Sequence, residues 1–378
     1  MKNKSIGILG GGQLCQMLSN FLISQNEKVY FLDPTENPPA INTGAQHIKK
    51  NYDDDNVIDF LIEKCKFITY EFENIPIKTV EELEKHIPVF PSSSILKIAQ
   101  NRTLEKKEFI KSGIKTPKFI YAKDKSSIED ILNNTYINLP VIIKTNTMGY
   151  DGKGQSVLKD RNEFENILNI LPQKTEFIIE EKINFSKEIS VIVGRDKFEN
   201  LYNFSPIENI HKNGILDYSI YPARIGDELS KKAICLAKKF ATNLNLIGIM
   251  AVEMFIDEKN EIYFNEIAPR PHNSGHLTIE SHNESQYSML GKIILGEKIR
   301  PPKSNVKSIM KNILGEFYLK DNYEKILSNI NKEDNHYIHI YNKSSAKIGR
   351  KMGHITVITD DIEKTIDKMN TNINGKIK

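Results

Sequence analysis

The stretch Asn265–His276 has the sequence Asn-Glu-Ile-Ala-Pro-Arg-Pro-His-Asn-Ser-Gly-His and is the most informative part of this chain. It overlaps the end of Glu261–Ile267, where polar and apolar residues alternate as they do in a half-buried β-strand. Gly248–Ile256 alternates in the same way, and the polar residues Asp257–Asn260 predict a turn between the two segments. We therefore expect a β-hairpin that leads directly into the stretch.

Closing this hairpin about the centre of its turn predicts three facing pairs: Asp257 with Ile262, Phe255 with Phe264, and Glu253 with Glu266. Facing side chains lie about 5 Å apart, so Glu253 and Glu266 would repel each other and one pKa would rise. A bound Mg²⁺, which prefers one or two carboxylates together with phosphate oxygens, would remove the repulsion. The alternative is a glutamate rotated into solvent, but the Arg, His and Asn residues that follow favour the metal site.

Length and composition bound the class of protein. The chain has 378 residues, enough for two or three domains with a large core. Its 39% hydrophobic and 27% charged residues are typical of a soluble enzyme. The net charge of +3 is small and the basic residues are scattered, so we expect specific anion sites and no nucleic-acid partner.

The cysteines and the N-terminus indicate the compartment. Cys15, Cys65 and Cys235 are far apart without a metal-binding spacing, which fits a reduced interior. The first residues lead into a strand without the apolar region of a signal peptide, and no run of 18 apolar residues occurs. We expect a cytoplasmic protein that does not associate with a membrane.

Strand and helix patterns alternate in the first part of the chain. Ser5–Leu9, Lys28–Asp33 and Cys65–Tyr70 have the pattern of buried strands, and apolar residues in Leu14–Leu22 recur at helical spacing. This alternation predicts a parallel α/β sheet. Pro88–Ser94 has the composition of a domain boundary.

The middle of the chain predicts an α+β region. The expected elements are a helix from Ile95 to Ser112, strands at Pro140–Lys144, Glu176–Glu180 and Glu188–Arg195, a helix at Ser230–Asn245, and the hairpin 248–267. A smaller unit follows Leu295. We expect domains at 1–94, 95–295 and 296–378.

A first glycine loop, Gly10–Cys15, follows the first strand. It has the spacing Gly-x-Gly-x-x but ends in Cys where a dinucleotide fingerprint needs Gly or Ala, although Asp33 lies near the place of a ribose-binding acid. Backbone amides at a helix N-terminus can bind any phosphate. An anion-binding loop is favoured, with NAD binding and a purely structural turn as the alternatives.

A second glycine loop, Gly149–Gln155, follows the strand that ends in Lys144. It does not have the Walker A pattern, but its glycines would let main-chain amides approach phosphate oxygens. A strand-end lysine supplies a point charge for the same phosphates. A functional lid is favoured over a mobile hairpin tip.

Other polar segments carry less information by themselves. Glu180–Ile183, with Glu188 beyond it, is more typical of a solvated acidic turn, and a single His211 is more often structural than catalytic. The basic turn Lys347–Lys351 leaves a phosphate contact and a solvated surface equally open.

Together these segments resemble the ATP-grasp superfamily and, within it, the N5-carboxyaminoimidazole ribonucleotide synthetases of purine biosynthesis. The resemblance covers essentially the whole chain and is carried by Gly10–Leu14, Leu32–Pro34, Gly149–Gln155, Glu180–Ile183, Asn265–His276 and Gly349–His354. The run His-Asn-Ser-Gly-His is the most specific motif. The implied fold is α/β and α+β, with an N-terminal parallel α/β (pre-ATP-grasp) domain, a central ATP-grasp domain and a small C-terminal domain.

The resemblance implies a nucleotide site built from several segments. The implied ATP ligands are Arg102, Lys144, Gly149, Tyr150, Asp151, Gly152, Lys153, Gly154, Gln155, Glu180, Glu181, Lys182, Ile183, Glu188, His211, Asn265 and Glu266. Among them, Arg102 and Lys144 would bind phosphates beneath a lid formed by 149–155. Residues 180–183 would bind adenine through their backbone, and Glu188 would bind the ribose.

The resemblance also implies catalytic, metal-binding and substrate-binding residues. The implied catalytic residues are Asp151, Lys153, Arg270, His272 and Asn273, and the implied Mg²⁺ ligands are Glu253 and Glu266. Arg270, His272 and Asn273 would face bicarbonate, while Asp151 and Lys153 would approach the acceptor amine. The residues implied to hold the ribonucleotide are Gly12, Gln13, Glu73, Lys347, Arg350 and Lys351.

The implied reaction is the ATP-driven carboxylation of 5-aminoimidazole ribonucleotide with bicarbonate, through carboxyphosphate, to the N5-carbamate, ADP and phosphate. The implied metal is Mg²⁺, with Mn²⁺ as the alternative, and ATP is a co-substrate. No biotin-carrier sequence is present, so we expect no biotin. Family resemblance also implies a homodimer.

The chain departs from the family pattern at particular positions. Cys15-Gln16 replaces the usual Gly-Arg, Met148 stands where a glycine is frequent, and Ala268 stands where many other ATP-grasp enzymes have a metal-binding Asn. The competing interpretations are an ATP-grasp ligase that uses formate and glycinamide ribonucleotide, an NAD(P)-dependent oxidoreductase, and an inactive nucleotide-binding module.

Overall fold

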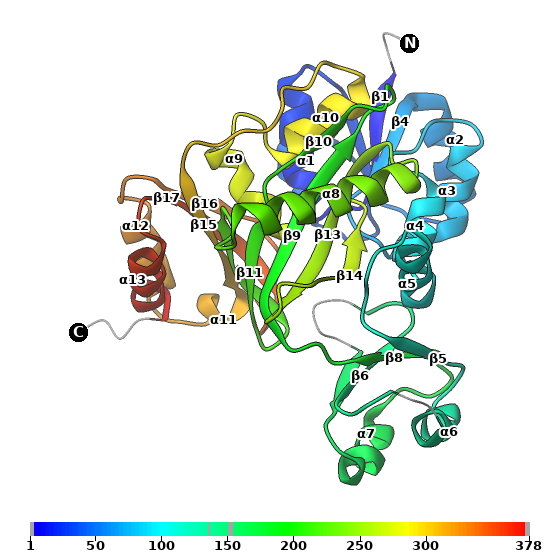
Figure 1. Ribbon diagram of the computed structural model, residues 1–378. Helices are drawn as coiled ribbons and strands as arrows, with labels where there is room; N and C mark the ends of the chain where they lie inside the picture. The colour runs from blue at the N-terminus through cyan, green and yellow to red at the C-terminus, as the bar shows by residue number, and fades with distance from the viewer. Residues whose placement is uncertain (1–3, 135–136, 150–153, 375–378) are drawn as a thin grey trace.

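The structure is a computed structural model that describes residues 4–134, 137–149 and 154–374 (Figure 1). The first part of the chain forms a parallel sheet with the strand order β3-β2-β1-β4. Its elements are β1 (Ser5–Leu9), α1 (Gln13–Ser24), β2 (Val29–Leu32), the 3₁₀ turn η1 (Pro39–Thr43), β3 (Gln46–Ile48), α2 (Asp55–Lys64), β4 (Cys65–Tyr70) and α3 (Ile77–Glu84). The parallel α/β sheet expected from the sequence is confirmed.

An antiparallel sheet of four strands forms a separate lobe, which lies at the bottom of Figure 1. Its elements are β5 (Phe119–Ala122), α6 (Ser126–Asn134), β6 (Val141–Thr145), β7 (Gln155–Leu158), η2 (Arg161–Glu163), α7 (Phe164–Ile170) and β8 (Phe177–Glu181). Ile128 of α6 and Ile167 of α7 pack with Val141 and Phe177 in a hydrophobic cluster of the lobe itself.

The largest sheet has nine strands in the order β14-β13-β9-β11-β12-β15-β17-β16, with β10 paired to β9. The strands are β9 (Phe185–Arg195), β10 (Leu201–Asn203), β11 (Ile207–Lys212), β12 (Ile215–Tyr221), β13 (Gly248–Asp257), β14 (Ile262–Ala268), β15 (Lys307–Leu314), β16 (His336–Ile340) and β17 (Lys351–Thr359). Because β12 pairs with β15, the C-terminal strands continue the sheet of the central region.

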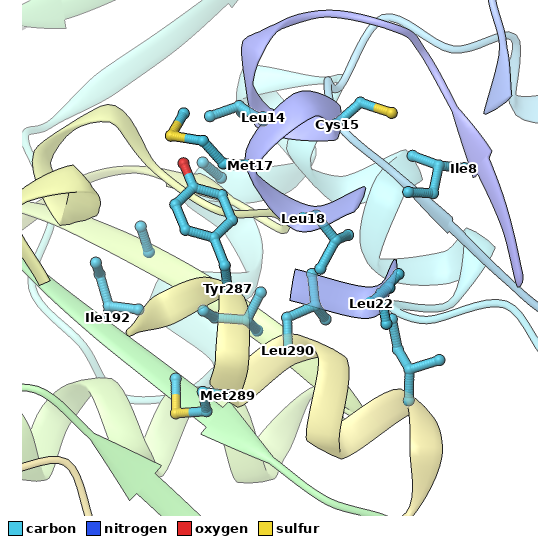
Figure 2. Close-up of a cluster of buried hydrophobic side chains, with 14 of the residues drawn as sticks. Ile8, Leu14, Cys15, Met17, Leu18, Leu22, Ile192, Tyr287, Met289 and Leu290 are labelled. Carbon is cyan, nitrogen blue, oxygen red and sulfur yellow. The ribbon is translucent and has the colours of Figure 1, made fainter. Parts of the chain in front are cut away.

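Helices cover this sheet and join it to the first one. The helical elements that follow β8 in the chain are α8 (Asp227–Asn243), η3 (Asn273–Leu277), α9 (Thr278–Ser281), α10 (Gln286–Leu295), α11 (Gly315–Tyr318), α12 (Tyr323–Ile330) and α13 (Ile362–Asn374). Figure 2 shows Leu14, Met17 and Leu18 of α1 packed near Tyr287 and Leu290 of α10 in one buried cluster. The two sheets are therefore held together by a shared core.

The helix expected from Ile95 to Ser112 is interrupted, so that prediction is wrong in its middle. The chain forms α4 (Ser93–Ala99) and α5 (Arg102–Lys111) instead. Asn101 is the N-cap of α5, and its side-chain oxygen accepts a hydrogen bond from the Leu104 N–H at 3.0 Å. A side chain that satisfies a free N–H favours the start of a new helix at this point.

The hairpin is confirmed, and Glu253 faces Glu266 as expected. The pairs nearer the turn differ by one residue from the expected ones: Met254 with Phe264, Phe255 with Tyr263 and Ile256 with Ile262. The register shifts because β14 has one extra residue, Asn265, between the two sets of pairs. Without this β-bulge, the register near the turn would place Asn265, and not Glu266, opposite Glu253.

No helix within the described residues is long and apolar enough to cross a membrane. The three cysteines are free thiols, of which Cys15 and Cys65 are buried and Cys235 is exposed.

Candidate active site

Three acidic residues lie on the neighbouring strands β14, β13 and β9, and each has a basic partner. Glu266 accepts a hydrogen bond from Arg102 Nη1 at 2.7 Å. Glu253 Oε1 lies 3.0 Å from His272 Nε2, and Glu188 Oε2 lies 3.0 Å from His211 Nδ1. The fold therefore gathers three carboxyl groups along one end of the sheet and gives each of them a nitrogen-bearing side chain as its partner.

The pKa values of these groups depend on burial and on their partners. Burial raises the pKa of Glu188, against the effect of His211, and the charges of Glu253 and Glu266 raise it further. Burial also opposes ionisation of Glu266, but Arg102 outweighs it and lowers the pKa to about 2. Glu266 is therefore a carboxylate at neutral pH.

The residues at this end of the sheet fit a hard divalent cation. Glu253 and Glu266 face each other, and the buried Oδ1 of Asn265 has no hydrogen-bond partner within the described residues. Such oxygens are the ligands that Mg²⁺ prefers, usually together with phosphate and water. Within the same residues, no group of three His, Cys, Asp or Glu forms a complete metal site.

Two lysines converge on Glu180, at the end of β8. Lys144 Nζ donates to Glu180 Oε2 at 2.7 Å, and Lys106 Nζ lies 3.5 Å from Glu180 Oε1. Burial opposes ionisation of Glu180, but Lys106 and Lys144 together lower its pKa to about 2. Beyond Glu180, Lys182 is exposed and Ile183 is partly buried.

A cavity joins the parts of the site. It is lined by Glu73 after β4, Arg102 of α5, Asn146 and Gly149 of the lobe, and Glu266 of β14. Tyr150, Asp151, Gly152 and Lys153 lie outside the described residues. Gly154 has φ of +75°, and a Cβ there would come within 2.7 Å of Thr145 Oγ1. Gln155 begins β7, opposite Lys144.

Met148 adopts a left-handed backbone conformation, with φ of 63°. This conformation is uncommon for a residue with a side chain, while glycine adopts it readily. Met148 therefore adopts this conformation at some cost in backbone strain.

The His-Asn-Ser-Gly-His run lies beside the carboxylates, with His272 Nε2 3.0 Å from Glu253 Oε1. Gln286 accepts a hydrogen bond from the His272 N–H at 2.8 Å and donates to the His272 carbonyl at 2.7 Å. The side-chain oxygen and nitrogen of Asn273 are buried and have no hydrogen-bond partner within the described residues. Arg270 binds both oxygens of Glu73, at 2.5 and 2.9 Å.

The first glycine loop binds carboxylates of the chain itself. The Gly11 N–H donates to Asp33 Oδ2 at 2.8 Å. The N–H groups of Gly12 and Cys15 both donate to the Glu71 carboxylate, that of Cys15 at 3.0 Å. Gln13 is the first residue of α1. The amides of this loop are therefore occupied by side chains of the protein itself, and phosphate binding by the loop stays a prediction.

The C-terminal basic turn is ordered by its own backbone. Arg350 Nη1 donates to the Ser345 carbonyl at 2.8 Å, and the Arg350 N–H donates to Lys347 O at 2.9 Å. Lys351 begins β17, and His354 on the same strand stacks on His276 with the ring centroids 4.6 Å apart. The turn thus approaches the segment that contains His272 and Asn273.

Sequence reasoning missed several charged residues of the site. Glu105 and Lys106 are fully buried in α5, and Glu71 binds the glycine loop. A helix with charged residues on every side gives no signal that two of them are buried. Glu71 could have been found, because it directly follows a buried strand and precedes Glu73.

Comparison with known proteins identifies related sequences and structures. A model of the ribonucleotide synthetase preATP-grasp domain matches residues 2–100, a model of the ATP-grasp domain matches 107–287, and a model of the phosphoribosylaminoimidazole carboxylase C-terminal domain matches 308–368. N5-carboxyaminoimidazole ribonucleotide synthase of Bacillus subtilis (strain 168) is 36% identical over 365 residues, covering 96% of this chain and 94% of the relative. The Staphylococcus aureus (strain COL) enzyme of the same name is 34% identical over 372 residues, covering 98% and 97%.

Solved structures agree in fold over the whole length. An ADP complex of N5-carboxyaminoimidazole ribonucleotide synthetase has a TM-score of 0.90 at 38% identity, covering 98% of this chain and 96% of that one. The Aspergillus clavatus synthase in complex with ADP and 5-aminoimidazole ribonucleotide has a TM-score of 0.89 at 28% identity, covering 99% of each chain.

Proposed function

The chain belongs to the N5-carboxyaminoimidazole ribonucleotide synthase family of ATP-grasp ligases, and on this basis we propose which of its residues contact each substrate. The enzyme carboxylates 5-aminoimidazole ribonucleotide at the expense of ATP, in purine biosynthesis. A bicarbonate oxygen attacks the γ-phosphorus and ADP leaves. The carboxyphosphate gives up phosphate as the ribonucleotide amine bonds to the carboxyl carbon and loses a proton.

The nucleotide lies between the lobe and the large sheet in this proposal. Lys144 and Arg102 contact its phosphates, and residues 149–155 cover them. The backbone of 180–183 contacts adenine, Glu188 contacts the ribose, and His211, Asn265 and Glu266 complete this side. Domains 1–94, 95–295 and 296–378 then serve ribonucleotide binding, nucleotide binding and closure of the ribonucleotide site.

Glu253 and Glu266 are the proposed ligands of Mg²⁺, with Mn²⁺ as the alternative. A bound cation supplies positive charge to the phosphate oxygens on which negative charge develops. The facing of the carboxylates, the low pKa of Glu266 and the unpartnered Asn265 Oδ1 within the described residues support this assignment. Arg102 would exchange some of its contact with Glu266 for phosphate.

Arg270, His272 and Asn273 are the proposed bicarbonate and carboxyphosphate contacts. The guanidinium of Arg270 holds the Glu73 carboxylate at two points, which is the geometry that a planar bicarbonate would also use. Asn273 offers a buried donor and a buried acceptor. Asp151 and Lys153 would approach the acceptor amine, and a closed site would keep water from carboxyphosphate.

Gly12, Gln13, Glu73, Lys347, Arg350 and Lys351 are the proposed ribonucleotide contacts. Glu71 and Asp33 occupy the loop amides, so the substrate phosphate would be bound mainly by the basic turn. We further propose that the protein is cytoplasmic and forms a homodimer. Sedimentation of the purified protein would test the dimer, and a monomer at micromolar concentration would contradict it.

The observation that carries this proposal is the cavity in which Glu73, Arg102, Gly149 and Glu266 meet from different parts of the chain. The test is ADP release with Mg-ATP and 5-aminoimidazole ribonucleotide in degassed buffer, with and without ¹³C-bicarbonate. We expect fast release only with both substrates, together with a new ¹³C carbamate signal. Release that does not depend on bicarbonate would contradict the proposal, and formate with glycinamide ribonucleotide would then be tried.

A further inference from the structure

Lys106 is a fully buried cation that connects the two halves of the nucleotide site. Its ammonium donates to the carbonyl oxygen of Asn265 on β14 at 2.6 Å. The same nitrogen lies 3.5 Å from Glu180 Oε1 on β8 of the lobe, and the Lys106 side chain has 0% exposure. Figure 1 shows α5, which carries Lys106, at the junction between the lobe and the large sheet.

Glu180 therefore has one cation on each of its oxygens. Lys144 is hydrogen-bonded to Oε2, whereas Oε1 has no hydrogen-bond partner within the described residues and faces Lys106. Glu180 is 1% exposed, so solvent cannot stabilise its charge. Removal of one partner from a buried ion pair is strongly unfavourable, because the other charge is left uncompensated.

This arrangement creates a difficulty for ATP binding. If Lys144 turns from Glu180 to the phosphates of ATP, it withdraws a hydrogen bond from a carboxylate that is buried and ionised. The ligand would then bind weakly, since part of its interaction energy would be lost in leaving the Glu180 charge buried without a counter-ion.

We propose that Lys106 is the permanent counter-ion of Glu180, which allows Lys144 to leave this carboxylate and bind the ATP phosphates. Lys106 is then a positioning residue, because it acts through Glu180 and Lys144 and touches no substrate. The inference rests on the proposed function, in which Lys144 is an ATP ligand. The burial of Lys106 and its bond to Asn265 keep it in place whichever partner Lys144 has.

The dependence between the charges is mutual. Burial lowers the pKa of Lys106, and the Glu180 charge acts in the opposite direction and favours the ammonium form. Glu105, the neighbour of Lys106 in α5, has its pKa raised to about 8 by burial despite the Lys106 charge. Glu105 also accepts a hydrogen bond from the Ile267 N–H at 2.6 Å. Glu180, whose Oε1 lies 3.5 Å from Lys106 Nζ, is the carboxylate that forms the ion pair with Lys106.

The test is the affinity for Mg-ADP, measured by calorimetry on the full chain, in Lys106→Met, Lys144→Met, Glu180→Gln and the double variant Lys106→Met/Glu180→Gln. We expect Lys106→Met to weaken binding by about 5- to 150-fold, the usual range for coupling between sites. In the Glu180→Gln background the same substitution should change the affinity less than about threefold, because no charge remains to be balanced.

Lys311→Met is the matched control. Lys311 is also a buried lysine with a carboxylate partner, Asp217 at 2.6 Å, but it lies on β15 outside the proposed contacts. Its substitution should leave Mg-ADP affinity unchanged. Thermal melts of each variant separate a loss of affinity from a loss of fold.

The outcomes distinguish this inference from the function on which it rests. If Lys144→Met does not weaken Mg-ADP binding, the proposed nucleotide site is wrong. If Lys144→Met weakens binding but Lys106→Met does not, only the counter-ion role is overturned. The counter-ion role would also be overturned if Lys106→Met weakened binding in the Glu180→Gln background as much as it does in the wild-type background, because Lys106 would then act only as an anchor for Asn265.

The double variant also decides the matter if Lys106→Met does not fold. In that case the double variant is compared with Glu180→Gln, which has the same uncharged side chain at position 180. A double variant that folds and binds Mg-ADP within about threefold of Glu180→Gln supports the counter-ion role, because the failure of Lys106→Met to fold then requires the Glu180 charge. Clearly weaker binding by the double variant would overturn it.

Discussion

At the scale of single residues, the site depends on glutamates whose charge states differ although they lie close together. Arg102 lowers the pKa of Glu266 to about 2 in spite of burial. Burial, with added repulsion from Glu266, raises the pKa of Glu105 to about 8. Sequence reasoning predicted the facing glutamates because alternation fixes which side chains share a face. It could not predict Glu105, because burial of a helical carboxyl depends on the tertiary packing around it.

Glu266→Gln should abolish most Mg²⁺-dependent turnover while the protein remains folded. We expect kcat to fall by ~100-fold, the upper end of losses at metal-site residues, since the amide cannot replace a carboxylate ligand. The measurement is turnover against Mg²⁺ concentration, with a circular dichroism melt. Glu261→Gln, at the exposed turn end of β14 and 3.6 Å from Lys115, is the control and should stay near wild type. An unchanged kcat in Glu266→Gln would contradict the proposal that Glu266 is a ligand of Mg²⁺.

His282 should make the stability of the fold depend on pH. Burial lowers its pKa to about 4, whereas a histidine in the unfolded chain has a pKa of about 6.5. As pH falls, the unfolded chain therefore takes up the proton first. The stability that His282 contributes is complete above pH ~6.5 and is lost as pH falls towards 4.

The comparison that isolates this effect is His282→Phe against wild type, in urea unfolding at several pH values. The difference in free energy of unfolding, variant minus wild type, should be constant above pH ~7 and rise by about 3 kcal/mol by pH ~4. The phenyl ring can keep the edge contacts with Phe204 and Tyr221. A difference that does not vary with pH would show that His282 titrates alike in both states.

At the scale of elements, the pattern of apolar residues predicted most strands and helices but not the places where the backbone departs from regularity. The strands of the first sheet and the hairpin follow from alternation and buried apolar runs. The break at Asn101 and the bulge at Asn265 do not, because each depends on a specific hydrogen bond or on packing against another segment. Both irregularities lie beside functional residues, Arg102 and Glu266.

Asn101→Ala should destabilise α5 by about 1 kcal/mol, the usual cost of removing an N-cap side chain. The Leu104 N–H would lose its acceptor at the helix N-terminus. Hydrogen exchange of the α5 amides measures this locally, and the free-energy change corresponds to exchange about fivefold faster. Ser92→Ala at the start of α4 is the control, since the Ser92 side chain makes no capping bond. Equal effects in both variants would contradict the capping role.

At the scale of the whole molecule, the C-terminal strands complete a sheet that begins in the central region. The pairing of β12 with β15 and of β15 with β17 brings the basic turn before β17 towards the His-Asn-Ser-Gly-His run. The sequence indicated a smaller C-terminal unit, and the family resemblance implied its role. Local patterns could not predict the shared sheet, because pairing between strands that are far apart in the chain has no local signature.

Arg350→Ala tests whether this distant turn serves the ribonucleotide. The Arg350 guanidinium is oriented by Ser345, whose carbonyl oxygen accepts from Nη1 at 2.8 Å. A hydrogen bond to a charged group contributes about 1.5–3 kcal/mol, so we expect KM for the ribonucleotide to rise by at least ~10-fold. KM for ATP should stay within about twofold, because ATP is proposed to bind between the lobe and β14. Arg300→Ala, at an exposed arginine in the segment before β15, should change neither constant. If only the KM for ATP rose, the basic turn would contact the nucleotide, and its assignment to the ribonucleotide site would be wrong.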